Sequence, residues 1–169
     1  MMNFEKATSA DLFDYAANWE DQVHGEDPED LAWVFVDVFP LNALDSSASD
    51  WARWFTQENE EADVPDYWMG LMDVVGTSRM DPLVIGLFND PTGVVVNVWD
   101  GSHRVGAACT AGLSHLPVVL GVPRDLTWDQ VPSALKRSIP AHDAIAQVLG
   151  PAPELNPVEP PPRRRRRQP

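Results

Sequence analysis

The sequence predicts the α/β or α+β fold class, with a small mixed sheet flanked by helices. Two apolar runs rich in β-branched residues, 94–99 and 116–120, are typical of strands. Residues 102–111 between them have the composition of a helix that starts after the turn Asp100-Gly101 and ends before a glycine. The order strand, tight turn, helix, strand indicates helices packed against a sheet.

A helical extension is predicted for residues 1–30, ahead of the core. Ser9 is a suitable N-cap and Asp11 suits the first turn of a helix that runs to about Trp19. Residues 20–30 are acidic and are expected to form a loop.

The core is predicted over residues 31–124 and begins with a strand over 31–39, which Asp37 interrupts and Pro40 ends. A helix over about 51–61 follows, capped by Ser49-Asp50. Its aromatic residues have the i, i+3, i+4 spacing of a core face, with a platform for stacking bases as the functional alternative. These residues are Trp51, Trp54 and Phe55.

Two elements are predicted between that helix and the central strand. Pro65 can occupy the first turn of a short helix that reaches residue 75 and is closed by Gly76. A hairpin at 89–93 then leads into the strand at 94–99.

Two helices are predicted for residues 125–150. Thr127 is a plausible N-cap for the first, which runs to about Ser138, and the second spans 141–149 after Pro140 breaks the chain. The composition then changes, because six of the twelve residues 151–162 are proline and the run Arg163 to Arg167 follows. Residues 151–169 are therefore expected to be a disordered tail that could bind nucleic acid, an acidic partner or anionic lipid, or associate with the acidic body.

The chain is strongly acidic, with 12 Lys and Arg against 26 Asp and Glu and a net charge of −14. Five of the basic residues are in the tail, so the remainder has 7 basic and 26 acidic side chains and a net charge of −19. Duplex DNA is bound through clustered Lys and Arg. This excess of acidic residues argues against duplex DNA binding by the part of the chain outside the tail. It is compatible with a small, local pocket for an anion.

The compartment is expected to be the cytoplasm. No apolar run approaches about 18 residues, so no membrane span is expected, and residues 1–6 lack the pattern of a signal peptide. The single Cys109 can form no internal disulfide and is expected to be a buried structural thiol.

The central motif Asp100-Gly101-Ser102-His103-Arg104 has the features of a phosphate site. A glycine turn at a helix N-terminus offers free N–H groups and the positive end of the helix dipole. Ser102 could donate hydrogen bonds, His103 could donate or act as acid or base, and Arg104 could bind two phosphate oxygens. Asp100 could hold a metal, orient its neighbours or cap the helix.

Three of the seven basic residues outside the tail fall at the ends of predicted core strands or in the motif turn. They are Arg79, Arg104 and Arg124. Strand ends and a helix N-terminus form the usual ligand crevice of an α/β sheet. We therefore expect these arginines to converge on an anionic ligand, with pairing to neighbouring carboxylates as the alternative.

These motifs resemble the nucleotide-binding core of the ParB/sulfiredoxin superfamily over roughly residues 33–124. ParB proteins have a Gly-Glu-Arg-Arg turn, an Ala-rich helix, an Ala-Gly pair and a Pro-containing strand. Sulfiredoxins have Gly-Cys-His-Arg at the turn, and some free serine kinases have Asp-Gly-His-His-Arg. The matching positions are Gly101 to Arg104, Ala107-Ala108, Ala111-Gly112, Leu116 to Val119 and, upstream, Pro82 to Ile85.

The chain departs from these relatives in two places. Ser102 stands where sulfiredoxins have the reactive cysteine, which argues against sulfinic-acid repair. Only residues 125–150 are expected to be structured after the core, which argues against the helix-turn-helix and dimerisation domains of ParB. The resemblance still implies a site for the phosphates of ATP or a related nucleotide, Mg²⁺ as cofactor, and phosphoryl transfer or phosphodiester hydrolysis.

Such chemistry needs a base or a metal-binding carboxylate. Outside the motif, the candidates for this base or metal-binding carboxylate are Asp37, Asp45 and Asp81. His24, His115 and His142 are isolated, and no His/Cys cluster has the spacing of a zinc site. The predicted catalytic residues are His103, Asp100 and Asp37, and the predicted nucleotide-binding residues are Gly101, Ser102, His103, Arg104, Arg79 and Arg124.

Two functions follow as hypotheses. The first is a stand-alone nucleotide-binding enzyme, an ATPase, nuclease or phosphotransferase. The second is a non-enzymatic acidic regulator that binds a protein partner, by analogy with small acidic proteins of mobile elements and plasmids. Loss of function on changing His103 and Arg104 would favour the first, and loss on deleting residues 151–169 would favour the second.

Overall fold

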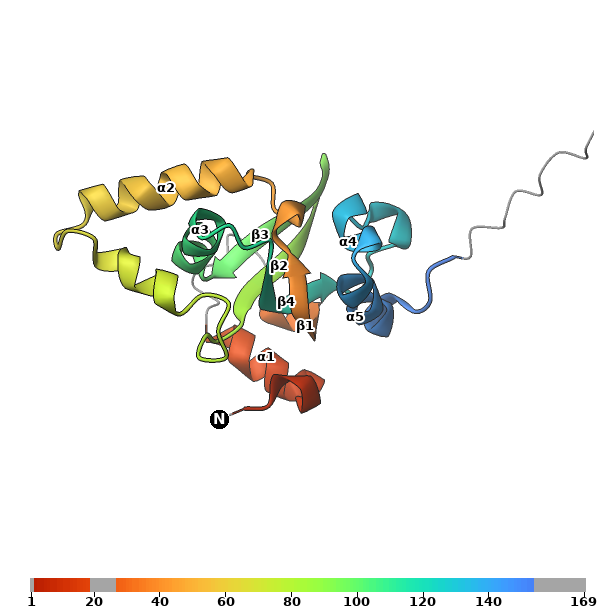
Figure 1. Cartoon of the computed structure of the whole chain (residues 1–169). Coiled ribbons are helices and arrows are strands. Elements are labelled where there is room, and N and C mark those ends of the chain that lie inside the picture. Colours follow the sequence, from red (N-terminus) through yellow and green to blue (C-terminus); the bar gives the residue numbers. More distant parts are fainter. Residues whose placement is uncertain (1, 19–26, 154–169) are drawn as a thin grey trace, which may run out of the picture.

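The computed structural model of the chain describes residues 2–18 and 27–153, and it confirms the predicted fold class. Four strands form one mixed sheet in the order β1-β4-β2-β3 (Figure 1). β2 and β4 are parallel, whereas β1 and β3 are antiparallel edge strands. The strands are β1 (Leu31–Pro40), β2 (Leu83–Asp90), β3 (Gly93–Asp100) and β4 (His115–Pro123).

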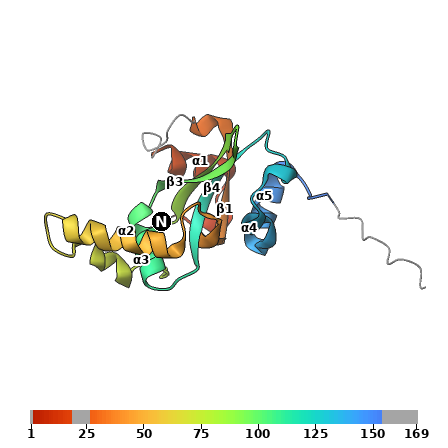
Figure 2. The same cartoon turned by 90° about the horizontal axis from the view of Figure 1, so that it is seen from above.

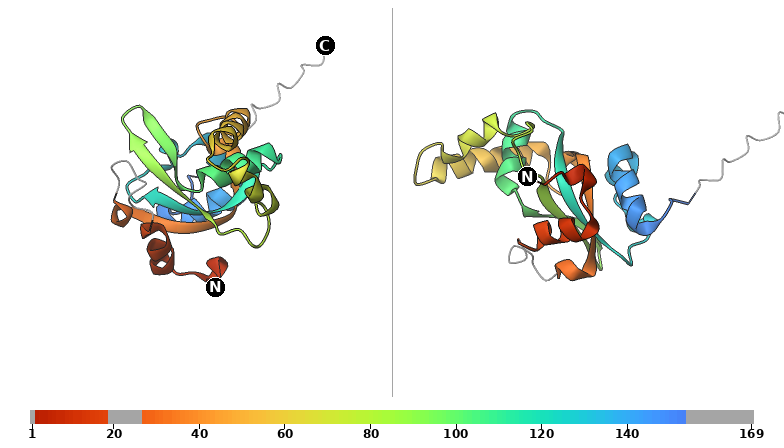
Figure 3. Two further views of the ribbon diagram at one scale, coloured as in Figure 1. Left: turned by 90° about the vertical axis from the view of Figure 1, so that its left-hand side faces the viewer. Right: turned by 90° about the horizontal axis from the view of Figure 1, so that it is seen from below.

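Helices cover both faces of this sheet (Figures 1 and 3). One face packs against α1 (Ser9–Ala17) through Leu12 and Ala16. The other face and its helices form the larger core. The helices on that face are α2 (Ala48–Glu61), α3 (Ser102–Thr110), α4 (Ser133–Arg137) and α5 (Ile139–Leu149).

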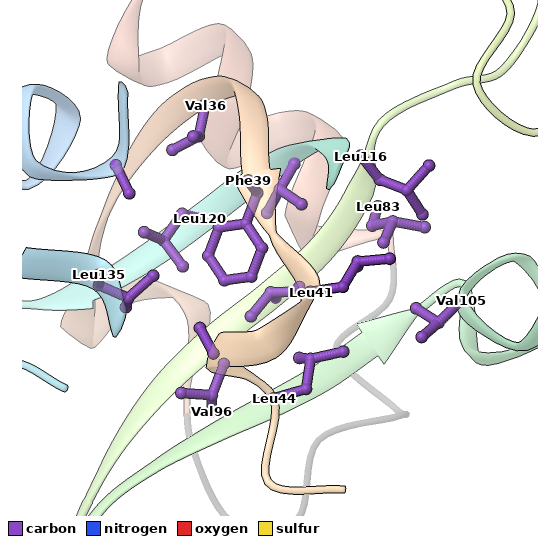
Figure 4. Packing of buried hydrophobic residues seen from close by; sticks show 14 of the residues in the cluster. Val36, Phe39, Leu41, Leu44, Leu83, Val96, Val105, Leu116, Leu120 and Leu135 are labelled. Carbon is purple, nitrogen blue, oxygen red and sulfur yellow. The ribbon is translucent and has the colours of Figure 1, made fainter. Parts of the chain in front are cut away.

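Side chains that alternate along the strands supply both cores, because successive residues point to opposite faces. In β1, Leu31 and Trp33 face α1, whereas Val34 and Val36 face the larger core. Figure 4 shows Val36 close to Phe39 and Leu120 in that larger core. A sheet buried on both faces explains why its strands are nearly continuous apolar runs in the sequence.

Two glycines in the central strands make room for tryptophans on the α1 face. Gly86 in β2 pairs with Gly121 in β4. A β-carbon on Gly86 would lie 2.5 Å from Nε1 of Trp99, and one on Gly121 would lie 2.7 Å from the ring of Trp33. The two rings meet edge to face with 5.1 Å between their centres. The small residues and the large ones therefore form one complementary layer.

The structure shifts two predicted helix starts. Thr8, not Ser9, caps α1, since its side chain accepts from the Asp11 N–H and the Asp11 carboxylate accepts from the Thr8 N–H. Ser47, not Ser49-Asp50, caps α2 by accepting from the Asp50 N–H. Thr8 and Asp11 exchange two hydrogen bonds and so satisfy two backbone N–H groups at the start of α1, whereas a single capping hydroxyl satisfies one. This difference favours Thr8 as the cap.

Other predicted boundaries change where proline or a tight turn intervenes. The predicted helix over 65–75 is the 3-10 helix η5 (Tyr67–Asp73). The predicted helix over 127–138 divides at Pro132 into η6 (Trp128–Gln130) and α4. Pro140 does not break the chain but lies in the first turn of α5, where its missing N–H costs no hydrogen bond. Further short 3-10 helices are η1 (Phe4–Lys6), η3 (Pro28–Asp30) and η4 (Leu41–Ala43).

The arrangement is elongated. α2, η5 and the loop between them project from one end of the molecule, and α4 and α5 lie at the other (Figures 1 and 2). Within residues 2–18 and 27–153 no helix has the length and apolarity to cross a membrane. The predicted end of the first helix at Trp19 and the predicted tail from residue 154 onward lie outside the described residues.

Candidate functional site

The motif turn lies where β3 ends and α3 begins, at the edge of the sheet where β2 starts. Gly101 has a φ of 108°, a left-handed conformation that favours glycine. A side chain at this position would collide with Leu83 and with the guanidinium of Arg104. Among the described residues no side chain caps α3, so the N–H groups of its first turn have no side-chain acceptor there.

A cavity of about 430 Å³ opens beside this turn. Four residues that the sequence analysis singled out line it, namely Arg79, Asp81, Asp100 and Arg104. Tyr15 from α1 lines it as well. Arg79 and Arg104 therefore line one cavity together with two carboxylates, and their convergence on an anionic ligand stays a prediction.

Internal contacts hold Arg104 in place within this cavity. Its Nη2 donates to Oδ2 of Asp100 at 2.7 Å, and its Nη1 donates to the backbone carbonyl of Asp81. The side chains of Arg104 and Asp100 are only 17% and 20% exposed. A guanidinium has five N–H donors, so part of the group remains for a ligand.

Arg79 is more open than Arg104. It is exposed, and within the described residues its side chain makes one hydrogen bond, from Nη2 to the backbone carbonyl of Asp73 at 3.0 Å. Of the two arginines, Arg79 is therefore the more available to an incoming anion.

Two groups in the cavity have shifted pKa values. Burial raises the pKa of Tyr15 to about 12, against the opposing effect of Arg104, and its hydroxyl donates to the carbonyl of Pro82 at 2.7 Å. Burial also raises the pKa of Asp100, and the nearby carboxylate of Asp81 adds to the rise, while Arg104 opposes it. Perturbed groups that share a cavity are typical of functional sites.

His103 faces away from this cavity, so His103 and Arg104 do not bind one anion together as the motif predicted. Its Nε2 lies 3.0 Å from Oε2 of Glu58 in α2. Its ring stacks on Trp68 with 3.6 Å between ring centres and lies 4.9 Å from the ring of Trp54. Successive residues of a helix point about 100° apart, which separates His103 from Arg104.

Ser102 lines a second cavity, of about 370 Å³, on the α2 side of the turn. Trp51 and Trp54 form its apolar wall, and Asp50 also borders it. Nε1 of Trp51 is buried and has no hydrogen-bond partner in residues 2–18 and 27–153. The Asp50 carboxylate binds Nη2 of Arg53 at 2.6 Å, an ion pair that is mostly exposed.

Three predicted site residues lie elsewhere. Arg124 follows β4 at the opposite edge of the sheet and donates to the carbonyl of Glu29 at 2.8 Å, so the predicted convergence is wrong for Arg124. Asp37 is exposed at an irregularity in β1, which two strands separate from β3. Asp45 lines a third cavity, of about 640 Å³, together with Cys109 and His115. β3 runs antiparallel to β2, so the N-terminus of α3, which follows β3, lies at the end of the sheet where β2 starts. Arg124 lies at the opposite end of the strands.

The carboxylates of the first cavity could hold Mg²⁺ together with the phosphates of a bound nucleotide, but not by themselves. In the described ranges no group of three or more His, Cys, Asp or Glu residues could hold a metal. Mg²⁺ is commonly bound by one or two carboxylates together with the phosphates of the substrate. Asp81 and Asp100 offer those two carboxylates.

The sequence analysis missed Tyr15, Glu58 and the stacking role of Trp68. Tyr15 lies on a helix that the motif does not include, and Glu58 was one of many acidic residues. Nothing in the local sequence marks either residue, because only packing of α1 and α2 brings them to α3.

Comparison with known proteins adds no relative. No protein-family model matches the chain, and neither a curated protein nor a solved structure matches it. The resemblance based on the motif at residues 100–104 therefore stays a prediction.

Proposed function

We propose that the protein binds a phosphate-bearing ligand, a nucleotide in the first instance, in the cavity beside the motif turn, and hydrolyses or transfers its phosphoryl group. The meeting of Arg79 and Arg104 with Asp100 in one cavity supports this most directly. The volume of about 430 Å³ lies within the usual range for small-molecule sites.

Each cavity residue has a distinct role in this proposal. Arg79 binds the phosphate through the side-chain donors that make no hydrogen bond within the described residues, since only Nη2 makes one there. Arg104 adds the donors that its contacts with Asp100 and Asp81 leave over, in a fixed orientation. The Tyr15 hydroxyl, whose pKa is about 12, stays protonated and orients the wall of the cavity.

Asp100 is the proposed acid. Its raised pKa lets the carboxyl keep its proton to a higher pH than an exposed aspartate would. In hydrolysis, the oxygen of a water forms a bond to phosphorus, the bond to the leaving oxygen breaks, and the Asp100 proton passes to that oxygen. A proton from the water restores the carboxyl. Mg²⁺, held by the Asp81 carboxylate with the phosphates, would neutralise charge on the transferred group.

The proposal changes the predicted catalytic set. His103 and Asp37 are outside the cavity, so neither touches the ligand. His103 is instead a positioning residue, since it ties the first turn of α3 to α2 and η5 through Glu58 and Trp68.

Thermal unfolding with ATP, ADP, CTP or GTP and Mg²⁺ tests this function. A ligand at about 100 times its Kd adds about 2.7 kcal/mol to the free energy of unfolding, which raises the Tm by roughly 5–10 °C. We expect Arg79→Ala to remove most of the shift. Arg53→Ala, an exposed arginine outside the cavity, is the matched control and keeps it.

Phosphate release then tests turnover, with Asp100→Asn expected to lower kcat. Arg104→Ala is a poor test of binding, because it also removes two contacts within the protein. A nucleotide shift that survives Arg79→Ala would contradict the proposed site, and no shift with any nucleotide would contradict the proposed ligand.

A further inference from the structure

Three exposed apolar side chains gather at the end of the projection formed by α2 and η5. Val64 is 59% exposed, Tyr67 62% and Met69 44%. The other large exposed apolar residues of the described chain lie far apart in the sequence: Met2 precedes η1, Val38 is in β1 and Ile139 is in α5. Apolar side chains that cluster on a projection are typical of an interaction surface.

From residue 54 onward this projection carries acidic side chains and no Lys or Arg. We call residues 54–78 the acidic arm. The arm contains six Asp and Glu residues and no Lys or Arg, a net charge of −6. Glu60, Asp63 and Asp66, which surround the three apolar residues in sequence, are all exposed. The surface therefore fits a partner that is both basic and able to cover apolar side chains.

An arginine run meets both requirements. A guanidinium can pair with carboxylates and stack on an aromatic ring such as that of Tyr67. The methylene stem of the same side chain can cover Val64 and Met69. The chain itself contains such a run at Arg163 to Arg167, with five of its twelve basic residues.

We propose that the acidic arm is a docking surface for Arg163 to Arg167 of a second copy of this chain. The docking surface is separate from the proposed nucleotide site, because Val74 is the one residue of the arm that lines the cavity beside the motif turn.

The geometry favours a second copy over the same chain. Figures 1 and 2 place the arm and α5 at opposite ends of the molecule. A path from α5 to the far end of the arm runs along the whole of α2, which is about 21 Å long for its 14 residues. It also crosses at least one layer of packed secondary structure, about 10 Å thick. The nine residues 154–162 reach about 30 Å when extended. A copy's own run would reach residues 64–69, at the far end of its arm, only at full stretch, whereas a neighbour is free of that limit.

Each copy has one arm and one arginine run, so the contact is head to tail. We expect the average mass of the full chain to rise with protein concentration at about 0.05 M salt. The mass should return to that of one chain at about 0.5 M salt, where charges are screened over a few ångströms. Sedimentation velocity measures both.

Paired variants locate the contact. Replacing Arg163 to Arg167 by serine should abolish association. Glu60→Lys with Asp63→Lys should weaken it at least about tenfold. Asp14→Lys with Asp125→Lys makes the same change of net charge at exposed sites away from the arm and should leave association in place. Tyr67→Ser should weaken association, whereas Val38→Ser should not.

Several results would overturn the proposal. One is a mass of a single chain at every concentration in low salt. Another is an equal loss of association in the arm pair and the Asp14 and Asp125 pair, which would indicate a general charge effect. A third is nucleic acid that copurifies through the arginine run in place of self-association. Nucleotide shifts in thermal unfolding are unaffected by the arm variants, so failure here is distinguishable from failure of the proposed function.

Discussion

Gly106 lies in the middle of α3 where this helix crosses α2, and replacing it with alanine sets two effects against each other. Alanine in a helix interior is more favourable than glycine by about 1 kcal/mol. A β-carbon at position 106, however, would lie 2.7 Å from Cβ of Phe55 and 3.1 Å from its Cδ2. Favourable carbon–carbon separations are about 3.5–4.0 Å.

The clash should win. Phe55 is 1% exposed, and the nearest clashing atom is its Cβ, which moves only with the backbone of α2. Overpacking of a core typically costs about 1–3 kcal/mol. Against the gain in helix propensity, the net loss for Gly106→Ala is about 1 kcal/mol, or a fall in Tm of about 2–4 °C.

Urea unfolding followed by tryptophan fluorescence measures this change. Gly70→Ala is the matched control, because a β-carbon on Gly70 meets nothing within 4 Å. The control should be neutral or stabilised by up to about 1 kcal/mol. If Gly106→Ala were as stable as Gly70→Ala, then α2 and α3 would not approach as closely as described, and the placement of His103 against Trp68 would fail with it.

Two further predictions concern groups in and beside the site. The pKa of Asp100 is raised above 3.8 in the folded protein, so the free energy of unfolding of the wild type falls as the pH rises from 3.8 through the raised pKa. Asp100→Asn cannot ionise, so urea titrations should show it gaining stability relative to the wild type across that pH range. A relative loss of stability would contradict the direction of the pKa shift. Asn59 is 5% exposed, accepts from the Trp68 N–H at 2.9 Å and donates to the Phe55 carbonyl at 2.9 Å, so Asn59→Ala should cost about 1–3 kcal/mol and speed proteolysis within η5. The exposed Gln57→Ala in the same helix is the control, and an equal cost for both would contradict this role of Asn59.

Local patterns in the sequence were enough for the fold class and for most elements. The alternation of apolar residues, the turn at Gly101 and the glycine after α3 depend on neighbours a few positions away, and they predicted β3, α3 and β4 with small errors. Errors fell where two local preferences competed. Thr8 and Ser9 both suit a cap, and only the reciprocal bonds with Asp11 select Thr8.

The sequence by itself determined the acidic composition, the arginine run and the residues of the motif turn. Tertiary structure decided which of them meet. Arg79 and Arg104 share a cavity because β2 starts where β3 ends, and Arg124 does not because β4 runs parallel to β2 and ends at the other edge. His103 faces α2 because the helix turns it away from Arg104. Spacing along the chain carries no information on such distances, which depend on strand order and on the packing of α1 and α2 against the sheet.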